Sequence, residues 1–446
     1  MDISKYLDKT IDCSCGKQHR LEIKDIIVCE NALRQVPDIV KKQGFQKPYL
    51  VCDCHTYQIA GKKIEQYLQK EGIPFQTFIF PDEALVPDEY AVGRLFTHLD
   101  ISCDLIIGIG SGTINDICRF VSYKLSKKYF IVGTAPSMDG FASNVTPLIV
   151  NDMKITYEAQ MPAAIIGDLD ILKNAPLPMI AAGVADILGK YVCLMDWKSA
   201  ALFFDEYYCP DVVEMVKQSI QDMIEQADNI QKRNPQTIKK VMEALIFSGI
   251  AMSYIGNSRP ASGGEHQMSH YWEMQFLFEK KPALLHGTKV GITTVGALYM
   301  YKKIAEMSPD FKAGANAALQ FSYDIWEKNI KKAYGKAADE VLSLEKIVAK
   351  NAPQKVLSRL KSMEKHWKDY IEEIRKLPDP SEIVDLLKKM EAPYSPAMVG
   401  VSELQVQNAV LYAKDLRNRF GFLQVLFDLQ IGEDFAAAVI EYYKSL

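Results

Sequence analysis

The 446-residue chain lacks an excess of either charge, a long uncharged apolar run and a dense set of cysteines. Its 52 Lys and Arg residues nearly balance its 56 Asp and Glu residues. This balance argues against nucleic-acid binding, which needs concentrated positive surface to displace counterions from phosphates. Nine cysteines spread over this length do not indicate a disulfide framework. We therefore expect a globular protein with no nucleic-acid partner.

Membrane insertion and secretion are also not predicted. The most apolar neighbourhood, residues 178–197, is interrupted by Asp186, Lys190 and Asp196, and charges near the centre of a span are costly in hydrocarbon. The amino-terminal residues 1–5 are polar and lead into no apolar segment, so a secretory signal is not expected. The sequence thus predicts a cytoplasmic location.

Two close cysteine pairs need an interpretation, because both have a histidine nearby. One structural zinc site that draws on Cys13, Cys15, Cys52 and Cys54 is the first alternative. The simpler alternative places the first pair, with Gly16, at a turn and the second pair at the end of a buried strand. We favour the simpler alternative, since cysteine is a good small core residue.

The first part of the chain alternates short apolar runs with longer amphipathic stretches. Such runs, bounded by turns and separated by helices, predict βαβ units around a parallel sheet that is buried on both faces. The apolar runs are 49–52, 77–80, 105–108 and 129–132, the helical patterns are 57–70, 89–98 and 114–125, and further strand-like pieces are 146–157 and 163–166.

Beyond the proline-containing segment 175–178 the pattern changes to helical periodicity almost without strand signals. We predict a Rossmann-like α/β domain over residues 1–174, followed by an all-helical domain over residues 175–446. The predicted helical segments are 180–204, 211–230, 236–256, 315–335, 339–349, 353–375, 381–390 and 402–417.

A glycine-rich segment, residues 108–113, follows a predicted strand and precedes a predicted helix. Glycines at this place let the backbone approach a pyrophosphate, and the helix amino terminus supplies unpaired N–H groups. The spacing differs from G-x-G-x-x-G and the segment follows a later strand, so a tight turn without a ligand is the alternative.

Two acidic residues follow predicted strands, at the edge where open α/β sheets bind their ligands. Asp53 can accept hydrogen bonds from an adenosine ribose, or it can cap the helix that begins near Thr56. Asp139 lies in a loop of small and hydroxyl residues, 134–143, and is either a ligand contact or an ordinary turn residue.

A metal-like set of residues combines Asp186 with three of the seven histidines. Asp186 lies in an apolar helical stretch, where an unpaired carboxylate is costly to bury, so it needs a metal or the ammonium of Lys190 one turn later. His266 and His270 project from one helix face, and His286 follows them. Asp186 with two of these imidazoles suits Zn²⁺ or a similar ion, and the spacing leaves open which two.

The chain resembles the sn-glycerol-1-phosphate dehydrogenase family, within the superfamily of iron-containing alcohol dehydrogenases, glycerol dehydrogenases and dehydroquinate synthases. The resemblance covers most of residues 45–300 and rests on four motifs in order, G-S-G-T-I-N-D, T-A-P-S-M-D-G-F-A-S, A-G-V-A-D-I-L-G-K and S-R-P-A-S-G-G-E-H-Q-M-S-H. It implies a homodimer that reversibly reduces dihydroxyacetone phosphate to sn-glycerol 1-phosphate with NAD(H) or NADP(H) and a metal. A dehydrogenase of glycerol or another small polyol, and a catalytically silent nucleotide-binding regulator, are the alternatives.

The resemblance also implies roles for individual residues. It makes Asp186, His266 and His286 the ligands of one divalent metal, with Zn²⁺ favoured over Ni²⁺ or Fe²⁺. It makes Asp139 and His270 the catalytic residues that contact substrate, as Asp186 does, with His270 as the proton relay. It places Asp53 at the ribose, and the residues that it places along the rest of the cofactor are Gly110, Ser111, Gly112, Thr113, Ile114, Thr134, Ala135, Pro136, Ser137 and Ser143.

The substrate phosphate needs a cation or backbone amides to receive it. Arg259 and Lys289 flank the histidines in sequence and are the nearest basic residues. We therefore expect one of them to bind the phosphate, with solvated surface charges as the alternative for both.

Overall fold

The computed structural model describes residues 3–151 and 153–446, so Met1 and Asp2 of the polar amino-terminal stretch lie outside the described residues. Packing divides the chain into two compact units. The first comprises Met1–Ile187 and Pro210–Ser258, and the second comprises Leu188–Cys209 and Arg259–Leu446. The predicted ranges 1–174 and 175–446 divide the chain by element type instead, and they stay a prediction of which segments bind the cofactor and which bind the metal.

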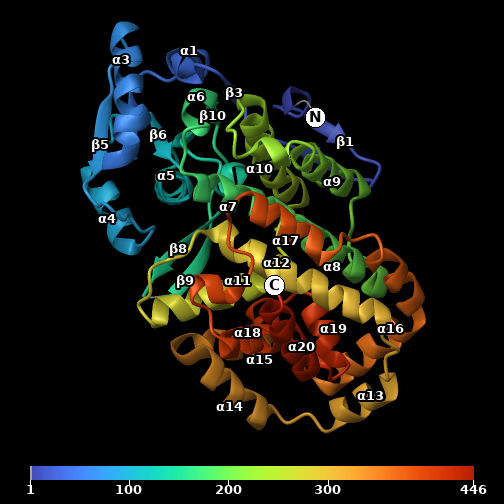
Figure 1. The fold of residues 1–446 in the computed structure, drawn as a ribbon. Coiled ribbons are helices and arrows are strands. Elements are labelled where there is room, and N and C mark those ends of the chain that lie inside the picture. Colours follow the sequence, from blue (N-terminus) through green and yellow to red (C-terminus); the bar gives the residue numbers. More distant parts are fainter. Residues whose placement is uncertain (1–2, 152) are drawn as a thin grey trace. The chain divides into compact units, whose positions relative to one another are not determined.

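A six-stranded sheet forms the centre of the first unit, with all neighbouring strands parallel (Figure 1). The strand order is β3-β10-β7-β6-β4-β5. The five apolar runs at 49–52, 77–80, 105–108, 129–132 and 163–166 all lie in this sheet, which confirms the predicted α/β architecture. The strands are β3 (Asp25–Cys29), β4 (Pro48–Asp53), β5 (Gln76–Phe80), β6 (Leu105–Gly110), β7 (Lys128–Gly133) and β10 (Ala164–Asp168).

The direction in which strands are added reverses between β4 and β6. Strand β5 pairs with one edge of β4, β6 pairs with the other edge, and the later strands extend beyond β6. Open α/β sheets bind ligands outside the carboxyl ends of the strands at such a reversal. Here those ends are Asp53 and Gly110, both predicted cofactor residues.

Two antiparallel hairpins and a set of helices complete the first unit. The predicted strand-like piece 146–157 is one hairpin, β8 (Val145–Val150) with β9 (Met153–Glu158), and the other hairpin is β1 (Thr10–Asp12) with β2 (Gln18–Arg20). The predicted helix 57–70 begins with a π-helical turn, Tyr57–Gly61. The helices are α1 (Val36–Lys42), α2 (Cys54–Thr56), α3 (Lys62–Lys70), α4 (Glu89–His98), α5 (Gly112–Lys124), α6 (Leu169–Leu172), α7 (Leu177–Leu188), α9 (Pro210–Ile224) and α10 (Pro235–Ile255).

The described residues of the second unit form helices and connecting loops, with no strand among them. Most of the predicted helical segments beyond residue 300 occur within a few residues of their expected bounds. Two long helices, α11 and α12, are not among the predicted helical segments, although the spacing of His266 and His270 implied a helix at those residues. The helices are α8 (Lys190–Phe204), α11 (Gly264–Phe278), α12 (His286–Glu306), α13 (Phe311–Leu319), α14 (Tyr323–Tyr334), α15 (Ala338–Val348), α16 (Pro353–Ile374), α17 (Pro380–Lys389), α18 (Glu403–Tyr412), α19 (Phe422–Asp428) and α20 (Gly432–Lys444).

Among the described residues, one helical stretch, Leu177–Phe204, is long and apolar enough to cross a membrane by length and composition alone. It consists of α7 and α8, which Gly189 separates. Because 78% of its most apolar window is buried inside the protein, it has the character of core helices.

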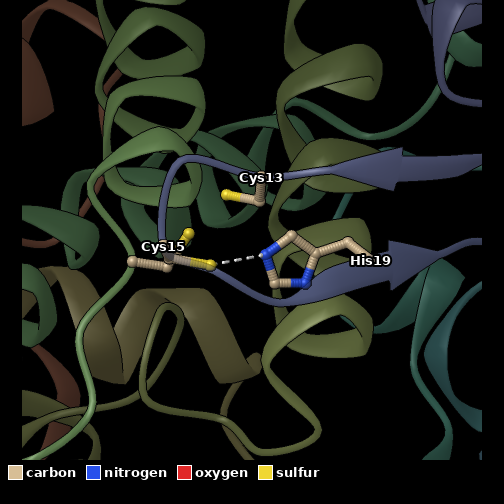
Figure 2. Close-up of side chains that lie close together, drawn as sticks. Cys13, Cys15 and His19 are labelled. Carbon is tan, nitrogen blue, oxygen red and sulfur yellow. Dashed lines mark hydrogen bonds between the residues drawn. The ribbon is translucent and has the colours of Figure 1, made fainter.

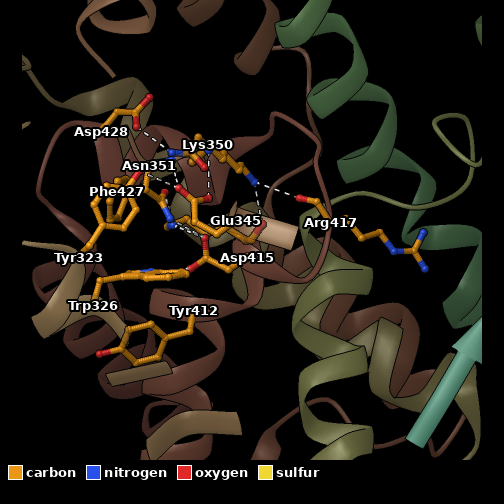
Figure 3. A network of polar contacts seen from close by, with 12 residues as sticks. Tyr323, Trp326, Glu345, Lys350, Asn351, Tyr412, Asp415, Arg417, Phe427 and Asp428 are labelled. Atoms are coloured by element: carbon orange, nitrogen blue, oxygen red, sulfur yellow. Dashed lines mark hydrogen bonds and ion pairs between the residues drawn. The ribbon is translucent and has the colours of Figure 1, made fainter. Parts of the chain in front are cut away.

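The second unit contains a buried polar network around Lys350 (Figure 3). The ammonium group of Lys350 donates to the carbonyl oxygens of Lys414 (2.7 Å) and Arg417 (3.2 Å). Its backbone N–H donates to the carboxylate of Glu345, and Asn351 donates to Asp415. Burial, followed by the nearby charge of Lys414, lowers the pKa of Lys350 to about 7.

This lowered pKa predicts a pH-dependent stability. Between pH 7 and about 10.5 the unfolded chain keeps a proton on Lys350 that the folded chain releases, so the free energy of unfolding rises with pH over this interval. The contribution is at most about 1.4 kcal/mol per pH unit. Urea denaturation at pH 7, 8.5 and 10 should show wild type gaining stability relative to Lys350→Met as pH rises. The exposed Lys346→Met control should track wild type.

Candidate active site

The glycine-rich segment joins strand β6 directly to helix α5. Ser111 precedes the first residue of α5 and makes no side-chain cap, so the N–H groups of the first turn are not satisfied by it. Such N–H groups, together with the helix dipole, bind phosphate oxygens. The Ser111 hydroxyl donates to the Ala135 carbonyl (3.1 Å) and lies 2.6 Å from the Ser137 hydroxyl, and the Thr134 N–H donates to the Gly110 carbonyl. The structure therefore brings together the two predicted cofactor loops.

Asp53 caps helix α2, which was the alternative to its predicted ribose contact. Its Oδ1 accepts the N–H groups of His55 (2.9 Å) and Thr56 (2.7 Å), and the Thr56 hydroxyl accepts the N–H of Asp53. Both bonds to the carboxylate use the same oxygen, so Oδ2 takes no part in the cap. The cap fixes the carboxylate at the carboxyl end of β4, and the ribose contact stays a prediction.

The loop 134–143 brings two predicted acidic residues together within the first unit. The Asp139 N–H donates to Asp186 Oδ2 (3.0 Å), and Asp139 Oδ2 accepts the hydroxyl of Ser248 on α10 (2.8 Å). The Ser143 hydroxyl donates to the Val145 carbonyl at the start of β8. Ser248 carries no motif in the sequence, because it lies 109 residues from Asp139, and only the fold reveals its contact.

Residues of the G-S-G-T-I-N-D motif, together with Arg119 one turn later on α5, support this loop through hydrogen bonds. Asn115 donates to the Gly140 carbonyl, and the buried Arg119 donates to the carbonyls of Gly140 and Val145. Arg119 also pairs with Asp116 (2.9 Å), whose pKa burial raises to about 6. The asparagine and aspartate of the motif are thus structural supports for the loop that carries Asp139.

Asp186 lies near the end of α7, one residue before the position in the sequence at which the first segment of the first unit ends. Helix α7 ends at Leu188 and α8 begins at Lys190, and Gly189 between them keeps helical backbone angles (φ −57°, ψ −23°). The pairing of Asp186 with Lys190 one helical turn later therefore stays a prediction. The Lys190 ammonium donates to the carbonyl of Ala261 (3.1 Å) within the second unit.

The three predicted histidines gather within the second unit. His266 and His270 lie on α11, and His286 begins α12. Their ring centroids are 5.2 Å apart for His266 and His286, 6.1 Å for His266 and His270, and 5.7 Å for His270 and His286. A ring nitrogen of His266 and one of His286 lie within 4.8 Å of each other, a separation at which two imidazoles can bind one ion.

Glu265 orients His266. Its Oε1 lies 2.6 Å from His266 Nδ1 and accepts the N–H of Gly263 (3.0 Å), whereas its Oε2 is buried and has no hydrogen-bond partner. A carboxylate on one ring nitrogen fixes the tautomer and leaves the other nitrogen as a metal ligand, which is the usual arrangement at metal-binding histidines. The donor chemistry of His266 and His286 therefore fits a divalent transition metal, and the role of Glu265 was not predicted although it is adjacent to His266 in sequence.

Glu273 connects His270 with Lys289. One carboxylate oxygen lies 3.4 Å from His270 Nδ1, and the other lies 3.2 Å from the Lys289 ammonium. Lys289 is almost fully buried and also donates to the Leu284 carbonyl. Arg259, the other predicted phosphate residue, forms a two-bond ion pair with Glu206 (2.6 and 2.5 Å).

Asp196 fixes the start of the helix that carries His266 and His270. This buried carboxylate accepts the N–H groups of Gly264 and Phe422 (2.7 Å each) and the hydroxyl of Tyr301 (2.6 Å). Burial raises its pKa to about 6, so at neutral pH it is ionised and accepts all three donors.

Replacing Asp196 with asparagine should destabilise the second unit. The new NH₂ group faces the N–H of Gly264 and leaves a buried donor unpaired, at a cost of about 3 kcal/mol. Urea denaturation should show this loss, and bound metal should decrease with it, because α11 loses its anchor. Asp205→Asn, at an exposed position with φ 54° that asparagine tolerates, should change neither value.

Comparison with known proteins identifies the family. The iron-containing alcohol dehydrogenase family model matches residues 27–176. A glycerol-1-phosphate dehydrogenase (NAD(P)+) from Halalkalibacterium halodurans is 35% identical over 312 residues, which are 69% of this chain and 78% of that protein. One from Geobacillus stearothermophilus is 32% identical over 94% of this chain and 96% of its own length.

Solved structures agree in fold. A probable glycerol dehydrogenase from Sinorhizobium meliloti has a TM-score of 0.64 at 12% identity, covering 95% of this chain and 98% of that one. The glycerol dehydrogenase of Schizosaccharomyces pombe has a TM-score of 0.62 at 14% identity. These structures confirm the predicted fold class, and the relatives confirm the resemblance seen in the motifs: the chain belongs to the glycerol-1-phosphate dehydrogenase family of oxidoreductases.

Proposed function

We propose that the protein reversibly reduces dihydroxyacetone phosphate to sn-glycerol 1-phosphate, with NAD(H) or NADP(H) and one divalent metal. The observation that carries this proposal is the histidine cluster, in which Glu265 orients His266 beside His286. Relatives that are named glycerol-1-phosphate dehydrogenase support the substrate. We further propose that the enzyme is a cytoplasmic homodimer.

We propose Asp186, His266 and His286 as the metal ligands. Asp186 belongs to the first unit and the histidines to the second. The chain passes between the units directly after Asp186 and again at residue 258, eight positions before His266. Both crossings thus lie close to the proposed ligands in sequence. A carboxylate with two imidazoles accommodates Zn²⁺, Ni²⁺ or Fe²⁺, and we expect Zn²⁺.

Each group at the proposed site has a separate role in the reaction. A metal bound there supplies Lewis-acid polarisation of the ketone oxygen, while the nicotinamide supplies hydride. His270, held at Nδ1 by Glu273, presents Nε2 to donate a proton to that oxygen in reduction and to accept it in oxidation. Asp139, held by Ser248, binds the substrate hydroxyl, and the loops 110–114 and 134–143 bind the cofactor with Asp53 at the ribose.

An absorbance assay of NADH and NADPH oxidation with dihydroxyacetone phosphate tests the proposal. Activity should disappear after exhaustive chelation and return when Zn²⁺, Ni²⁺ or Fe²⁺ is restored, and chiral analysis should identify the sn-1 product. Full activity without metal would rule out the metal-dependent mechanism. Faster turnover of unphosphorylated dihydroxyacetone would indicate a polyol dehydrogenase, and NADH binding without oxidation would indicate a silent regulator.

The phosphate-binding residue can be identified by comparing two substrates. Arg259→Ala should raise the KM for dihydroxyacetone phosphate much more than that for dihydroxyacetone if Arg259 binds the phosphate. Lys289→Ala should do so if Lys289 has that role, about tenfold or more for a charge-assisted contact. Both cations already have a carboxylate partner, Glu206 for Arg259 and Glu273 for Lys289. Because Glu273 also contacts His270, the proposed proton relay, we expect the larger difference from Lys289. Equal effects on both substrates would exclude the residue concerned.

A further inference from the structure

A second set of side chains of the types that ligate metals lies on the amino-terminal hairpin, in the first unit (Figure 2). Cys13 and Cys15 lie on the turn between β1 and β2, and His19 lies on β2. The two sulfur atoms and a ring nitrogen of His19 all lie within 4.8 Å of one another. Cys52 and Cys54 do not join this set, because they lie at the end of β4 as predicted, where their thiols point to the carbonyls of Phe78 and Asp82.

The backbone of the turn holds the two cysteines in place. The Cys13 N–H donates to the Lys17 carbonyl, and the Gly16 N–H donates back to the Cys13 carbonyl. Gly16 has φ 80°, which a glycine adopts without strain. The turn therefore directs both sulfur atoms to the same side as His19, in the short Cys-x-Cys spacing that suits one metal ion.

The ring of His19 is oriented as that of a metal ligand. Nδ1 lies 2.9 Å from the Tyr254 carbonyl, which can only accept a hydrogen bond, so Nδ1 carries the proton. Nε2 then has the lone pair, and it faces Cys15 Sγ at 3.5 Å. The ring is nearly buried and stacks on Tyr254, with centroids 5.1 Å apart. A carbonyl that holds one nitrogen and a lone pair directed at a thiol on the other is an arrangement that suits a zinc-binding histidine.

A third cysteine directly precedes helix α9, whose first turn contacts the hairpin turn. Asp211, in the first turn of α9, accepts hydrogen bonds from the Ser14 N–H (3.1 Å), the Ser14 hydroxyl (2.9 Å) and the Cys13 thiol (3.1 Å). Cys209 is two residues earlier in the chain, so its Cα lies within about 7 Å of that of Asp211. Cys209 is also fully buried. The sequence separates Cys209 from Cys15 by nearly 200 positions, which is why spacing alone did not reveal it.

We propose that Cys13, Cys15, His19 and Cys209 form a structural zinc site. Three thiolates and one imidazole are the ligand set of closed, tetrahedral zinc sites, and they leave no position for substrate. The site would fasten the hairpin to the start of α9 and the end of α10. A hairpin of two three-residue strands is too short to be stable alone, so a metal is a physical reason for its order. This inference does not depend on the proposed reaction.

Metal content separates this site from the proposed active site. We expect full-length wild type, purified without chelators, to hold two metal equivalents per chain, measured by inductively coupled plasma mass spectrometry. Cys15→Ser and His266→Ala should each hold one, and the double variant none. Cys29→Ser, which alters a cysteine on β3 outside the set, should hold two. An unchanged metal content in Cys15→Ser would overturn the proposal.

Cobalt loading tests the same site without a substitution. Wild type loaded with Co²⁺ should show the thiolate-to-cobalt charge-transfer absorption of a sulfur-rich site, and a mercurial that blocks thiols should abolish it. His266→Ala should keep this absorption, because the metal site that this substitution removes has no sulfur ligand and the cysteine site stays intact. Absence of the band, or a Cys13–Cys15 disulfide detected as a two-hydrogen mass deficit in the purified protein, would overturn the proposal.

Discussion

His266→Ala and His286→Ala are each expected to remove the active-site metal and to lower kcat/KM for dihydroxyacetone phosphate by about a thousandfold or more. The metal contributes several kcal/mol to stabilising the developing charge on the ketone oxygen, and about 4 kcal/mol corresponds to a thousandfold in rate. Each imidazole supplies one of only three proposed protein ligands, so its loss should cost most of the affinity. Elemental analysis and steady-state kinetics on the same preparations measure both effects.

His270→Ala provides the informative contrast within the cluster. Its ring is about as close to His286 as that of His266, yet we assign it to proton transfer. This variant should keep its metal and lose about a hundredfold or more in kcat, the usual contribution of a general acid. His366→Ala, on α16, should keep both metal and activity. Loss of metal in His270→Ala would reassign His270 as a ligand.

Glu265→Gln keeps His266 but weakens the hydrogen bond that orients its imidazole ring, so it tests the contribution of that orientation to metal binding. The Glu265 carboxylate accepts from the imidazole and from Gly263, and a neutral amide keeps the shape with a weaker acceptor. Residues in this position typically change metal affinity by about 10- to 100-fold. The variant should therefore recover activity when metal is added in excess, whereas His266→Ala should not.

The parallel sheet was predictable because its central strands are continuous apolar runs between turns. The five predicted runs form five of its six strands. Strand β3 (Asp25–Cys29) was not among the predicted strands, although its residues Ile26–Cys29 form a short apolar run like those of the other five.

Periodicity did not identify helices α11 and α12, for a reason connected with function. The first turns of α11 bury Glu265, His266, Gln267 and Ser269, so apolar residues do not recur at the helical period. Periodicity identifies helices with one polar and one apolar face, and it fails where polar side chains are buried for binding. The i, i+4 spacing of His266 and His270 implied a helix at these residues, but periodicity did not give its bounds.

The supporting residues were the least predictable part of the candidate site. Ser248, Asp196 and Glu273 make their contacts through the fold, and no motif marks them. By contrast, spacing did place His266 and His270 on one helix face. Sequence thus reveals the groups that carry chemistry, whose residue types are restricted, more readily than the groups that hold them.

Gly183→Ala is expected to disable the enzyme although it replaces none of the proposed metal ligands, catalytic residues or cofactor-binding residues. A Cβ at Gly183 would lie 1.9 Å from the carbonyl oxygen of Pro136, so α7 and the loop 134–143 would have to separate. Backbone on both sides of the contact cannot yield as a flexible side chain does. Asp186 lies three residues later on the same helix face, where its carboxylate accepts the N–H of Asp139. We expect weaker NADH binding, lower metal content and a kcat/KM reduced by about a hundredfold.

Gly93→Ala is the matched control, because Gly93 lies in helix α4 with nothing within 4 Å of the added Cβ. Alanine has the higher helix propensity, so this variant should be as active as wild type and more stable by up to about 1 kcal/mol. Gly183→Ala should instead lose about 1–3 kcal/mol from overpacking. Wild-type NADH affinity in Gly183→Ala would show that the contact between α7 and the 134–143 loop does not position the cofactor residues. If affinity and metal content fall together, that contact is what couples the cofactor loop to Asp186.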